Sequence, residues 1–236
     1  METALYLIPN LLGDTPVEKV LPAYNREVIL EIKHFIVEDI RTARRFLKLV
    51  DRSIDIDSLT FYTLNVHTRP EEVADMLEPL GNGCPMGVIS EAGCPAVADP
   101  GADVVAIAQR RGLKVVPLVG PSSIILSVMA SGFNGQSFAF NGYLPIEKEE
   151  RIKRLKALEQ RSRSEQQTQI FIETPYRNNR MLQDICSACK PDTLVCVASD
   201  LTCPDERVVV KSVGDLKKSP VDLPKIPCIF LIFARR

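Results

Sequence analysis

Acidic side chains follow several predicted strands of this 236-residue chain, and they are the first candidates for chemistry. Glu38 and Asp39 come directly after one apolar run, Glu91 follows a second, and Glu173 closes a third. A carboxylate there can act as a general base toward a hydroxyl nucleophile, and His67 offers the same chemistry through an imidazole. Other interpretations stay open: Asp39 could form an ion pair at a helix start, Glu91 could cap its loop, and a lone histidine is more often structural.

Two loops rich in glycine and proline offer a place for a ligand. The first covers residues 91–101 and follows a strand pattern at 87–90, and the second covers 120–123 and follows a strand pattern at 113–119. A helical pattern at 102–111 lies between them, which predicts parallel strands joined by a right-handed crossover. Both loops then lie beyond the carboxyl ends of strands, where open α/β sheets bind ligands. The glycines allow close backbone approach, and amides at a helix start such as Ser122-Ser123 can bind a carboxylate.

The remaining hydrophobic patterns place these groups on two kinds of sheet. In the first half, further strands are predicted at 4–8, 34–37 and 61–65, with helices at 16–31 and 70–80. Another helix is predicted after 38–41, from the spacing of the apolar residues Ala43, Phe46, Leu47 and Val50. In the second half, strands are predicted at 138–144, 169–173, 193–199, 206–212 and 226–233, with helices at 147–163 and 178–189. This order predicts two α/β domains, residues 1–136 and 137–236. The first has a mainly parallel sheet with helices on both faces, and the second has a mixed sheet.

Composition narrows the class of protein and its partners. The formal net charge is -1, so no global basic field attracts nucleic acid, and an RNA contact needs a local patch.

The start of the chain lacks the features of a signal peptide, and no apolar run is long enough to predict a membrane span. Seven cysteines in that context predict reduced thiols in the cytoplasm. Cys186-x-x-Cys189 has no matching second pair, so we expect no metal site.

Six sequence blocks resemble motifs of the tetrapyrrole-methylase superfamily. They are EDIRTARRFL (38–47), SEAGCPAVADPG (90–101), GPSSIILSVMASG (120–132), FNGYLPIEKEERIKRL (140–155), FIETPYRNNRMLQDI (171–185) and ASDLTCPDERVVVKSVGDL (198–216). The blocks occur in the family's order and cover nearly the whole chain. They are most similar to the branch that methylates ribose 2'-hydroxyls in small-subunit rRNA, whose first loop reads S-D-A-G-T-P-x-x-S-D-P-G.

The resemblance implies a fold, a cofactor and a substrate. It implies a two-domain tetrapyrrole-methylase-like fold that binds S-adenosylmethionine (SAM) in the cleft between the domains and releases S-adenosylhomocysteine. It also implies a homodimer whose methyl acceptor is rRNA or the small ribosomal subunit. Among the acidic and histidine side chains considered above, Glu38, Asp39 and His67 are the catalytic candidates. The implied SAM contacts are Ile8, Pro9, Ser90, Glu91, Gly93, Cys94, Ser122, Ser123, Phe171, Glu173, Ala198 and Cys228.

Departures from the family's motifs leave other functions open. The family's first strand usually ends T-P-I-G-N-L, whereas residues 8–14 read IPNLLGD, and the family's H-E-H-N is NVHT at 65–68. These differences fall in substrate or cofactor contacts. The alternatives are a precorrin-type small-molecule methylase or a protein methylase of the same superfamily, and a non-catalytic SAM-binding paralogue. The basic helix at 147–163 could contact RNA phosphates or be an ordinary solvated helix.

Overall fold

The chain divides into two compact units, Met1–Ser122 and Ser123–Arg236. The computed structural model describes residues 1–64, 68–223 and 225–235. The division precedes α7 (Ser123–Ser131) and is earlier than the boundary at 136/137 that the sequence predicted. It falls there because α7 packs against two strands of the second unit, β9 (Arg207–Ser212) and β10 (Cys228–Phe233).

A five-stranded parallel sheet organises the first unit, in the order β3-β2-β4-β1-β5. Its strands are β1 Leu5–Ile8, β2 His34–Val37, β3 Thr60–Thr63, β4 Met86–Ile89 and β5 Val115–Pro117. Leu5 of β1 is in register with Met86 of β4 on one side and with Val115 of β5 on the other. The parallel sheet predicted from the sequence is confirmed, and all five strands end at one edge.

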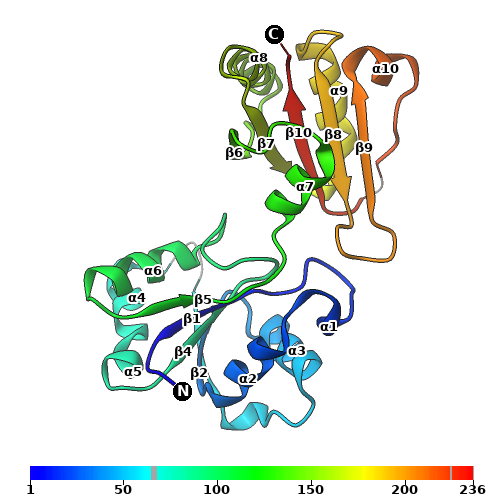
Figure 1. Ribbon diagram of the computed structural model, residues 1–236. Coiled ribbons are helices and arrows are strands. Elements are labelled where there is room, and N and C mark those ends of the chain that lie inside the picture. Colours follow the sequence, from blue (N-terminus) through cyan, green and yellow to red (C-terminus); the bar gives the residue numbers. More distant parts are fainter. Residues whose placement is uncertain (65–67, 224, 236) are drawn as a thin grey trace. The chain divides into compact units, whose positions relative to one another are not determined.

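Helices cover both faces of this sheet (Figure 1). One face carries α1 Val17–Val20, α2 Ala23–Glu31 and α3 Ile40–Val50, and the other carries α4 Pro70–Met76, α5 Glu78–Gly81 and α6 Gly101–Arg110. A short 3-10 turn, η1 Ile56–Ser58, precedes β3. Two helices predicted as continuous are broken, at Pro22 and next to Pro79. Proline has no amide hydrogen and clashes with the preceding turn, so neither helix runs on.

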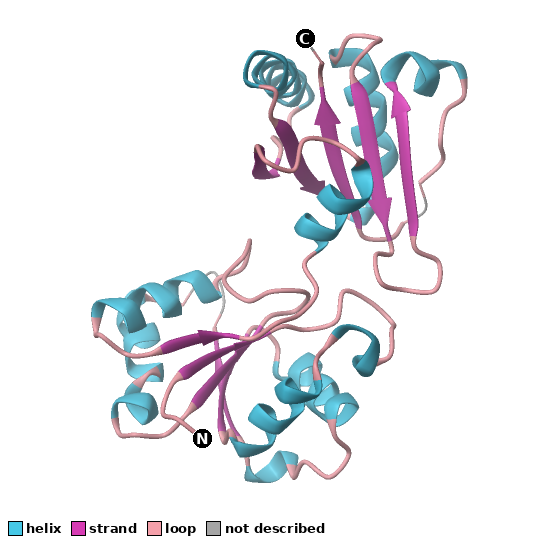
Figure 2. Ribbon diagram, viewed as in Figure 1, coloured by secondary structure: helices cyan, strands magenta, loops and turns pink. Residues whose placement is uncertain are grey.

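The second unit is built on a mixed five-stranded sheet in the order β6-β7-β10-β8-β9 (Figure 2). The strands that precede β9 and β10 are β6 Phe138–Tyr143, β7 Thr168–Glu173 and β8 Leu194–Ser199. The β6–β7 pair is parallel, and the other neighbouring pairs are antiparallel. The predicted mixed sheet is therefore confirmed.

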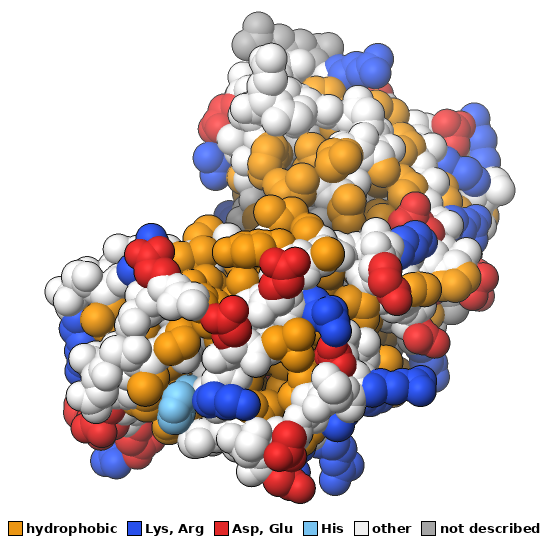
Figure 3. Space-filling model, turned by 60° about the horizontal axis from the view of Figure 1, so that its bottom comes forward, with side chains coloured by type: hydrophobic (Ala, Val, Ile, Leu, Met, Phe, Trp, Pro, Cys, Tyr) orange, Lys and Arg blue, Asp and Glu red, His pale blue; other side chains and the backbone are white. Residues whose placement is uncertain are grey.

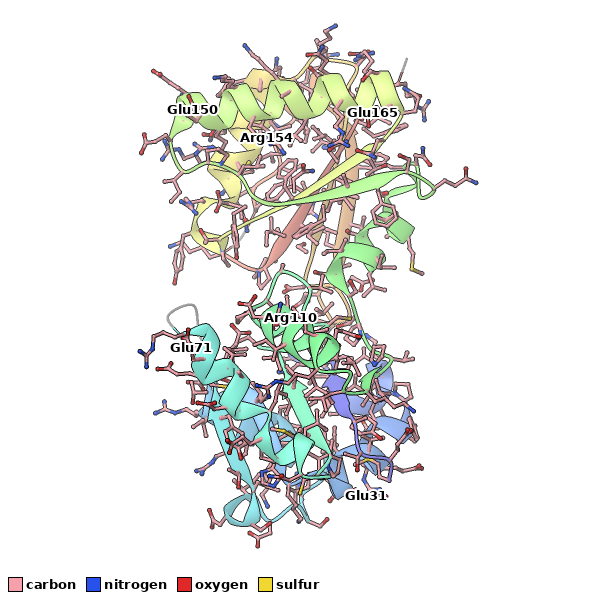
Figure 4. The ribbon with its side chains drawn as sticks, turned by 90° about the vertical axis from the view of Figure 1, so that its left-hand side faces the viewer. Glu31, Glu71, Arg110, Glu150, Arg154 and Glu165 are labelled. Carbon is pink, nitrogen blue, oxygen red and sulfur yellow. The ribbon has the colours of Figure 1, made fainter. Side chains whose placement is uncertain are left out.

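The helices of the second unit also lie on both faces of their sheet. One face carries α8 Lys148–Glu165, α9 Asn178–Ala188 and α10 Val213–Lys218, with the 3-10 turn η2 Pro175–Arg177 before α9, and α7 packs on the opposite face (Figures 1 and 4). Sequence patterns missed α10, although Ser212 caps it by accepting a hydrogen bond from the amide of Asp215 at 3.0 Å.

A buried ion pair joins α8 to α9, with Arg151 Nε donating to Asp184 Oδ2 at 2.8 Å.

Candidate active site

The loop after β1 is joined to the loop after β4 by Asn10. The side-chain amide of Asn10 donates to the carbonyl of Ser90 at 2.9 Å and to that of Glu91 at 3.2 Å. Its backbone amide donates to the carbonyl of Gly93 at 2.9 Å, and the amide of Gly93 donates back at 3.2 Å. Ser90 Oγ also donates to the carbonyl of Gly93 at 2.9 Å. The result is one hydrogen-bonded group beyond the strand ends, which consists of Asn10, Ser90, Glu91 and Gly93.

The loop after β5 meets the same group at Gly120. A Cβ on Gly120 would lie 2.3 Å from the Cβ of Pro9, so only glycine allows this approach. Cys94 Sγ donates to the carbonyl of Pro121 at 3.5 Å, which links the loops after β4 and β5. Strand β1 lies between β4 and β5, so these two strands are not adjacent, yet their loops meet beyond the end of β1.

The loop after β4 holds strained backbone. Ala96 and Ala98 have φ angles of 65° and 57°, a region that residues other than glycine rarely occupy. Asp99 Oδ1 holds this turn, because it accepts hydrogen bonds from the amides of Ala96 at 2.9 Å and Gly101 at 2.6 Å. Strain of this kind persists where the surrounding structure fixes it, and it is common at ligand sites.

Carboxylates from β2 and β4 gather at the same edge of the sheet. Glu38 hydrogen-bonds to Asp99, and the amide of Glu91 donates to Glu38 Oε1 at 3.4 Å. Burial, followed by the charge and hydrogen bond of Asp99, raises the pKa of Glu38 to about 7. The hydroxyl of Thr42 donates to Asp39 Oδ1 at 2.7 Å and contacts Glu91 Oε1 at 3.0 Å. Three predicted residues from two loops are thus brought together.

Asp39 caps α3, which limits what else its carboxylate can do. The amide of Thr42 donates to Asp39 Oδ1 at 2.8 Å, and together with the Thr42 hydroxyl it holds the pKa of Asp39 below its ordinary value. The helix start is thus made by an N-cap hydrogen bond, as is common for aspartate. A carboxylate of lowered pKa is the weaker base, so Glu38 is better suited than Asp39 to accept a proton near neutral pH.

A pocket of about 540 Å³ opens beside these carboxylates. Its walls come from the loop after β1, from α3 and from the start of the loop after β4: Asn10, Leu11, Leu12, Gly13, Asp14, Thr42, Arg45, Phe46, Leu49, Glu91 and Ala92. Its volume falls within the range of roughly 300–1,000 Å³ that is usual for small-molecule sites. Apolar walls combined with a few charged groups are the usual lining of such a site.

The site residues predicted in the second unit lie on three adjacent strands. Cys228 of β10 is in register with Glu173 of β7, and Ala198 of β8 pairs with Ile229. The Glu173 carboxylate already accepts from Arg177 Nε at 3.0 Å, which makes a general-base role harder for it. Phe171 is fully buried and stacks on Phe230 with ring centroids 5.9 Å apart, so its ring belongs to the core.

The structure also locates three other residues that were predicted for the site, Ser122, Ser123 and Ile8. Ser122 immediately precedes α7, and Ser123 is the first residue of that helix. The side chain of Ile8 is fully buried, which leaves its backbone as the group that could reach a ligand. His67 lies outside the described residues. Within the described part of the chain, no group of three His, Cys, Asp or Glu side chains could hold a metal ion.

Sequence reasoning missed both Asn10 and Asp99 as site residues. Asn10 follows Pro9 directly after β1 and is 7% exposed. The dipeptide Pro-Asn at a strand end is a turn signal, but it does not reveal which loop the amide will reach. The pairing of Asp99 with Glu38 joins segments that are far apart in sequence, so no local pattern reports it.

The chain belongs to the tetrapyrrole (corrin/porphyrin) methylase family, whose model matches residues 21–217. It is 30% identical to the ribosomal RNA small subunit methyltransferase I of Vibrio cholerae over 200 residues, which cover 84% of this chain and 65% of that protein. It is 29% identical to the protein of the same name from Escherichia coli O157:H7, over 90% of this chain and 70% of that one. The chain thus spans just under two thirds of the V. cholerae relative.

Solved structures show the same fold at lower sequence identity. The crystal structure of the methyltransferase CobJ matches with a TM-score of 0.64 and 16% identity, over 98% of this chain and 93% of that one. The two-unit α/β architecture is therefore that of a known methyltransferase fold.

Proposed function

We propose that this protein is a SAM-dependent methyltransferase that acts on a ribose 2'-hydroxyl of small-subunit rRNA. The observation that carries the proposal is the convergence of three loops, after β1, β4 and β5, at one edge of the parallel sheet in a member of a methylase family. Support for RNA as the acceptor comes from the two rRNA methyltransferases that resemble most of the chain.

The residues of these loops fit SAM. The close approach of Gly120 to Pro9, and the bridge between Gly93 and Asn10, leave main-chain groups near the edge where a ligand binds. Ser122 and Ser123 place the first amides of α7 at the end of the third loop, which suits the carboxylate of SAM. When bound, SAM supplies a methyl group activated by its sulfonium and leaves as S-adenosylhomocysteine.

Glu38 is the general base in this proposal. A ribose hydroxyl is a weak nucleophile at neutral pH, and the Glu38 carboxylate would take its proton as the oxygen attacks the methyl carbon. Burial and Asp99 bring the pKa of Glu38 to about 7, where a base is effective near neutral pH. Asp39 and Glu91, joined through Thr42, hold the neighbouring edge of the site.

The test uses tritiated SAM with small ribosomal subunits from a strain that lacks this gene. Label in the 16S-type RNA of the subunit, as a nucleotide that resists alkaline cleavage on its 3' side, supports ribose methylation. Label in a tetrapyrrole that replaces the subunits in a parallel reaction would support the precorrin-type alternative. SAM binding without any transfer would support the non-catalytic paralogue.

The cofactor site has its own test by calorimetry. A Ser122→Leu/Ser123→Leu variant places bulk at the start of α7 and should abolish SAM binding. The control variant Ser164→Leu/Ser219→Leu changes two exposed serines in the second unit and should bind SAM normally. Unchanged affinity in the first variant would show that SAM binds elsewhere.

We also propose a cytoplasmic homodimer. No disulfide joins any of the seven cysteines, all of which lie in the described part of the chain, as expected in a reducing compartment, and rRNA is a cytoplasmic substrate. The structure has no helix, among its described residues, that is long and apolar enough to cross a membrane.

The dimer follows from the family resemblance, and light scattering that gives the mass of one chain would refute it.

A further inference from the structure

A row of cations lies along the exposed side of α3. Arg41, Arg45 and Lys48 follow each other at intervals of four and three residues, which places them on one stripe of the helix. All three are exposed. The opposite side of α3 is buried in the core and consists of Ala43, Phe46 and Leu47. The stripe spans about 10 Å along the helix axis.

The stripe cations take no part in the ion pairs of the described residues, although the charge of Arg41 contributes to the lowered pKa of Asp39. Helix α3 contains four basic residues and no acidic residue, and within the described residues none of the three stripe cations forms an ion pair. Lys48 donates to the carbonyl of Arg52 at 3.0 Å, which keeps its charge near the surface. The fourth cation, Arg44, lies over the ring of Phe61 at 5.5 Å and is turned away from the stripe.

The longer basic helix, α8, is different because its arginines already have ion-pair or hydrogen-bond partners. Arg151 is buried against Asp184, Arg161 pairs with Glu165, and Arg163 pairs with Asp192. Arg154 donates to Asn141, and acidic residues such as Glu150 and Glu165 alternate with the cations along the helix (Figure 4). Figure 3 presents another face of the molecule, on which basic and acidic side chains are interspersed, so a stripe of one sign is a local feature. Helix α3 therefore offers the cleaner electrostatic match to a polyanion.

The stripe borders the pocket described above, and Arg45 belongs to both. The pocket has apolar walls from Leu11, Leu12, Phe46 and Leu49, and polar groups from Glu91 and Thr42 on the side of Glu38. Apolar walls suit a nucleobase, and carboxylates suit ribose hydroxyls. RNA-binding proteins combine these two features, a basic track for the backbone and a pocket for an unstacked base.

We propose that the Arg41–Arg45–Lys48 stripe of α3 binds the phosphates of a single-stranded RNA segment, and that the adjoining pocket receives one unstacked nucleotide of that segment. The inference rests on the proposed function, since it places the acceptor strand of methyl transfer. An anionic membrane suits the stripe less well, because surface-binding helices insert an apolar face and that face of α3 is buried in the core.

The test compares two triple variants with the same change in charge. Arg41→Gln/Arg45→Gln/Lys48→Gln removes the stripe, and Lys148→Gln/Lys153→Gln/Lys156→Gln removes three exposed lysines of α8. Both sets are on the surface, so both variants should fold and should bind SAM with the affinity of the unmodified protein. Fluorescence anisotropy then measures binding of a labelled single-stranded RNA over a series of salt concentrations.

The expected result is specific to α3. The slope of log affinity against log salt should fall by about 2 for the stripe variant, at about 0.7 per lost phosphate contact, and should stay unchanged for the α8 variant. Affinity at low salt should fall at least about tenfold for the stripe variant alone. In methyl-transfer assays the stripe variant should raise KM for RNA more than it lowers kcat.

Several outcomes would overturn the inference. Equal losses in the two triple variants would show a non-specific effect of net charge. Loss of binding to anionic phospholipid vesicles with RNA binding intact would assign the stripe to a membrane. Normal RNA binding and transfer by the stripe variant would refute the inference alone, whereas stripe-dependent RNA binding without any methyl transfer would refute the proposed function alone.

Discussion

Asn10 and Gly93 exchange both of their backbone hydrogen bonds, at 2.9 and 3.2 Å, although they lie in loops after different strands. The Asn10 side chain adds two more bonds to the same loop. The loops after β1 and β4 therefore behave as one rigid piece, and a ligand that binds there meets a preformed surface.

The contact between Gly120 and Pro9 gives the first prediction. Gly120→Ala would place a Cβ 2.3 Å from the Pro9 Cβ, and the closed proline ring cannot rotate away from it. We expect the free energy of unfolding of the first unit to fall by about 1–3 kcal/mol, and SAM affinity to fall with it. The control is Gly81→Ala, which has nothing within 4 Å and should be neutral or stabilising. Equal stability of the two variants in denaturant titrations would contradict the prediction.

The pKa of Glu38 predicts a dependence of stability on pH. Because burial and Asp99 raise this pKa to about 7, the folded protein binds the proton more tightly than the unfolded chain. The stabilisation is complete below the unfolded pKa of about 4.5 and is lost as pH rises through about 7. Relative to Glu38→Gln, the unmodified protein should lose about 1–2 kcal/mol over that range, after allowance for solvent screening.

Chemical denaturation of the two proteins at several pH values measures this difference. A difference that stays constant from pH 4.5 to pH 7.5 would show that Glu38 titrates normally. If Glu38 is the base, the same variant should lower kcat for methyl transfer by about 10²–10⁴-fold. The rate of the unmodified protein should rise with pH through about 7, since the carboxylate is the active form.

The buried pair of Arg151 and Asp184 predicts a large effect in the second unit. Arg151→Met leaves the Asp184 carboxylate buried without its partner, and removes the donors to the carbonyls of Pro145 and Ile146. We expect the free energy of unfolding to fall by about 3–5 kcal/mol. Arg161→Met breaks an exposed pair and should cost less than about 1 kcal/mol.

A double variant separates burial of a lone charge from loss of packing. Arg151→Met/Asp184→Leu removes both charges and should recover much of the lost stability. If the double variant is less stable than Arg151→Met alone, the main contribution of Arg151 is to packing and to the two carbonyls.

Three thiols should resist alkylation until the protein unfolds. Burial raises the pKa values of Cys189, Cys196 and Cys228 to about 12, so almost no thiolate exists at pH 8. Iodoacetamide followed by mass spectrometry should modify the half-buried Cys84 first. Modification of Cys228 at the rate of Cys84, in protein that is still folded, would contradict the burial of β10.

Local patterns were enough to predict the architecture. Alternating strand and helix patterns between residues 87 and 132 predicted the parallel sheet, and the strand-rich second half predicted the mixed one. The errors arose where local and tertiary preferences compete. Pro22 and Pro79 broke helices that hydrophobic spacing extended, and α10 is too short for a periodic pattern to show.

The site was harder to predict because its contacts join distant segments. The sequence placed Glu38 and Glu91 at strand ends, and the structure brings them together as the strand order requires. Nothing local indicates that Asp99 would hydrogen-bond to Glu38, or that Asn10 would reach Ser90 at the end of the neighbouring strand β4. Such pairings depend on strand order, which is a property of the whole fold.

The position of β1 also affects how the protein is made. This strand leaves the ribosome before its partners β4 and β5, and β4 is roughly 80 residues downstream. At ordinary translation rates β1 waits about 4–16 s for β4 to be synthesised. During that time an apolar segment with open hydrogen-bonding edges is exposed, so the nascent chain is a natural client for chaperones that bind short hydrophobic stretches.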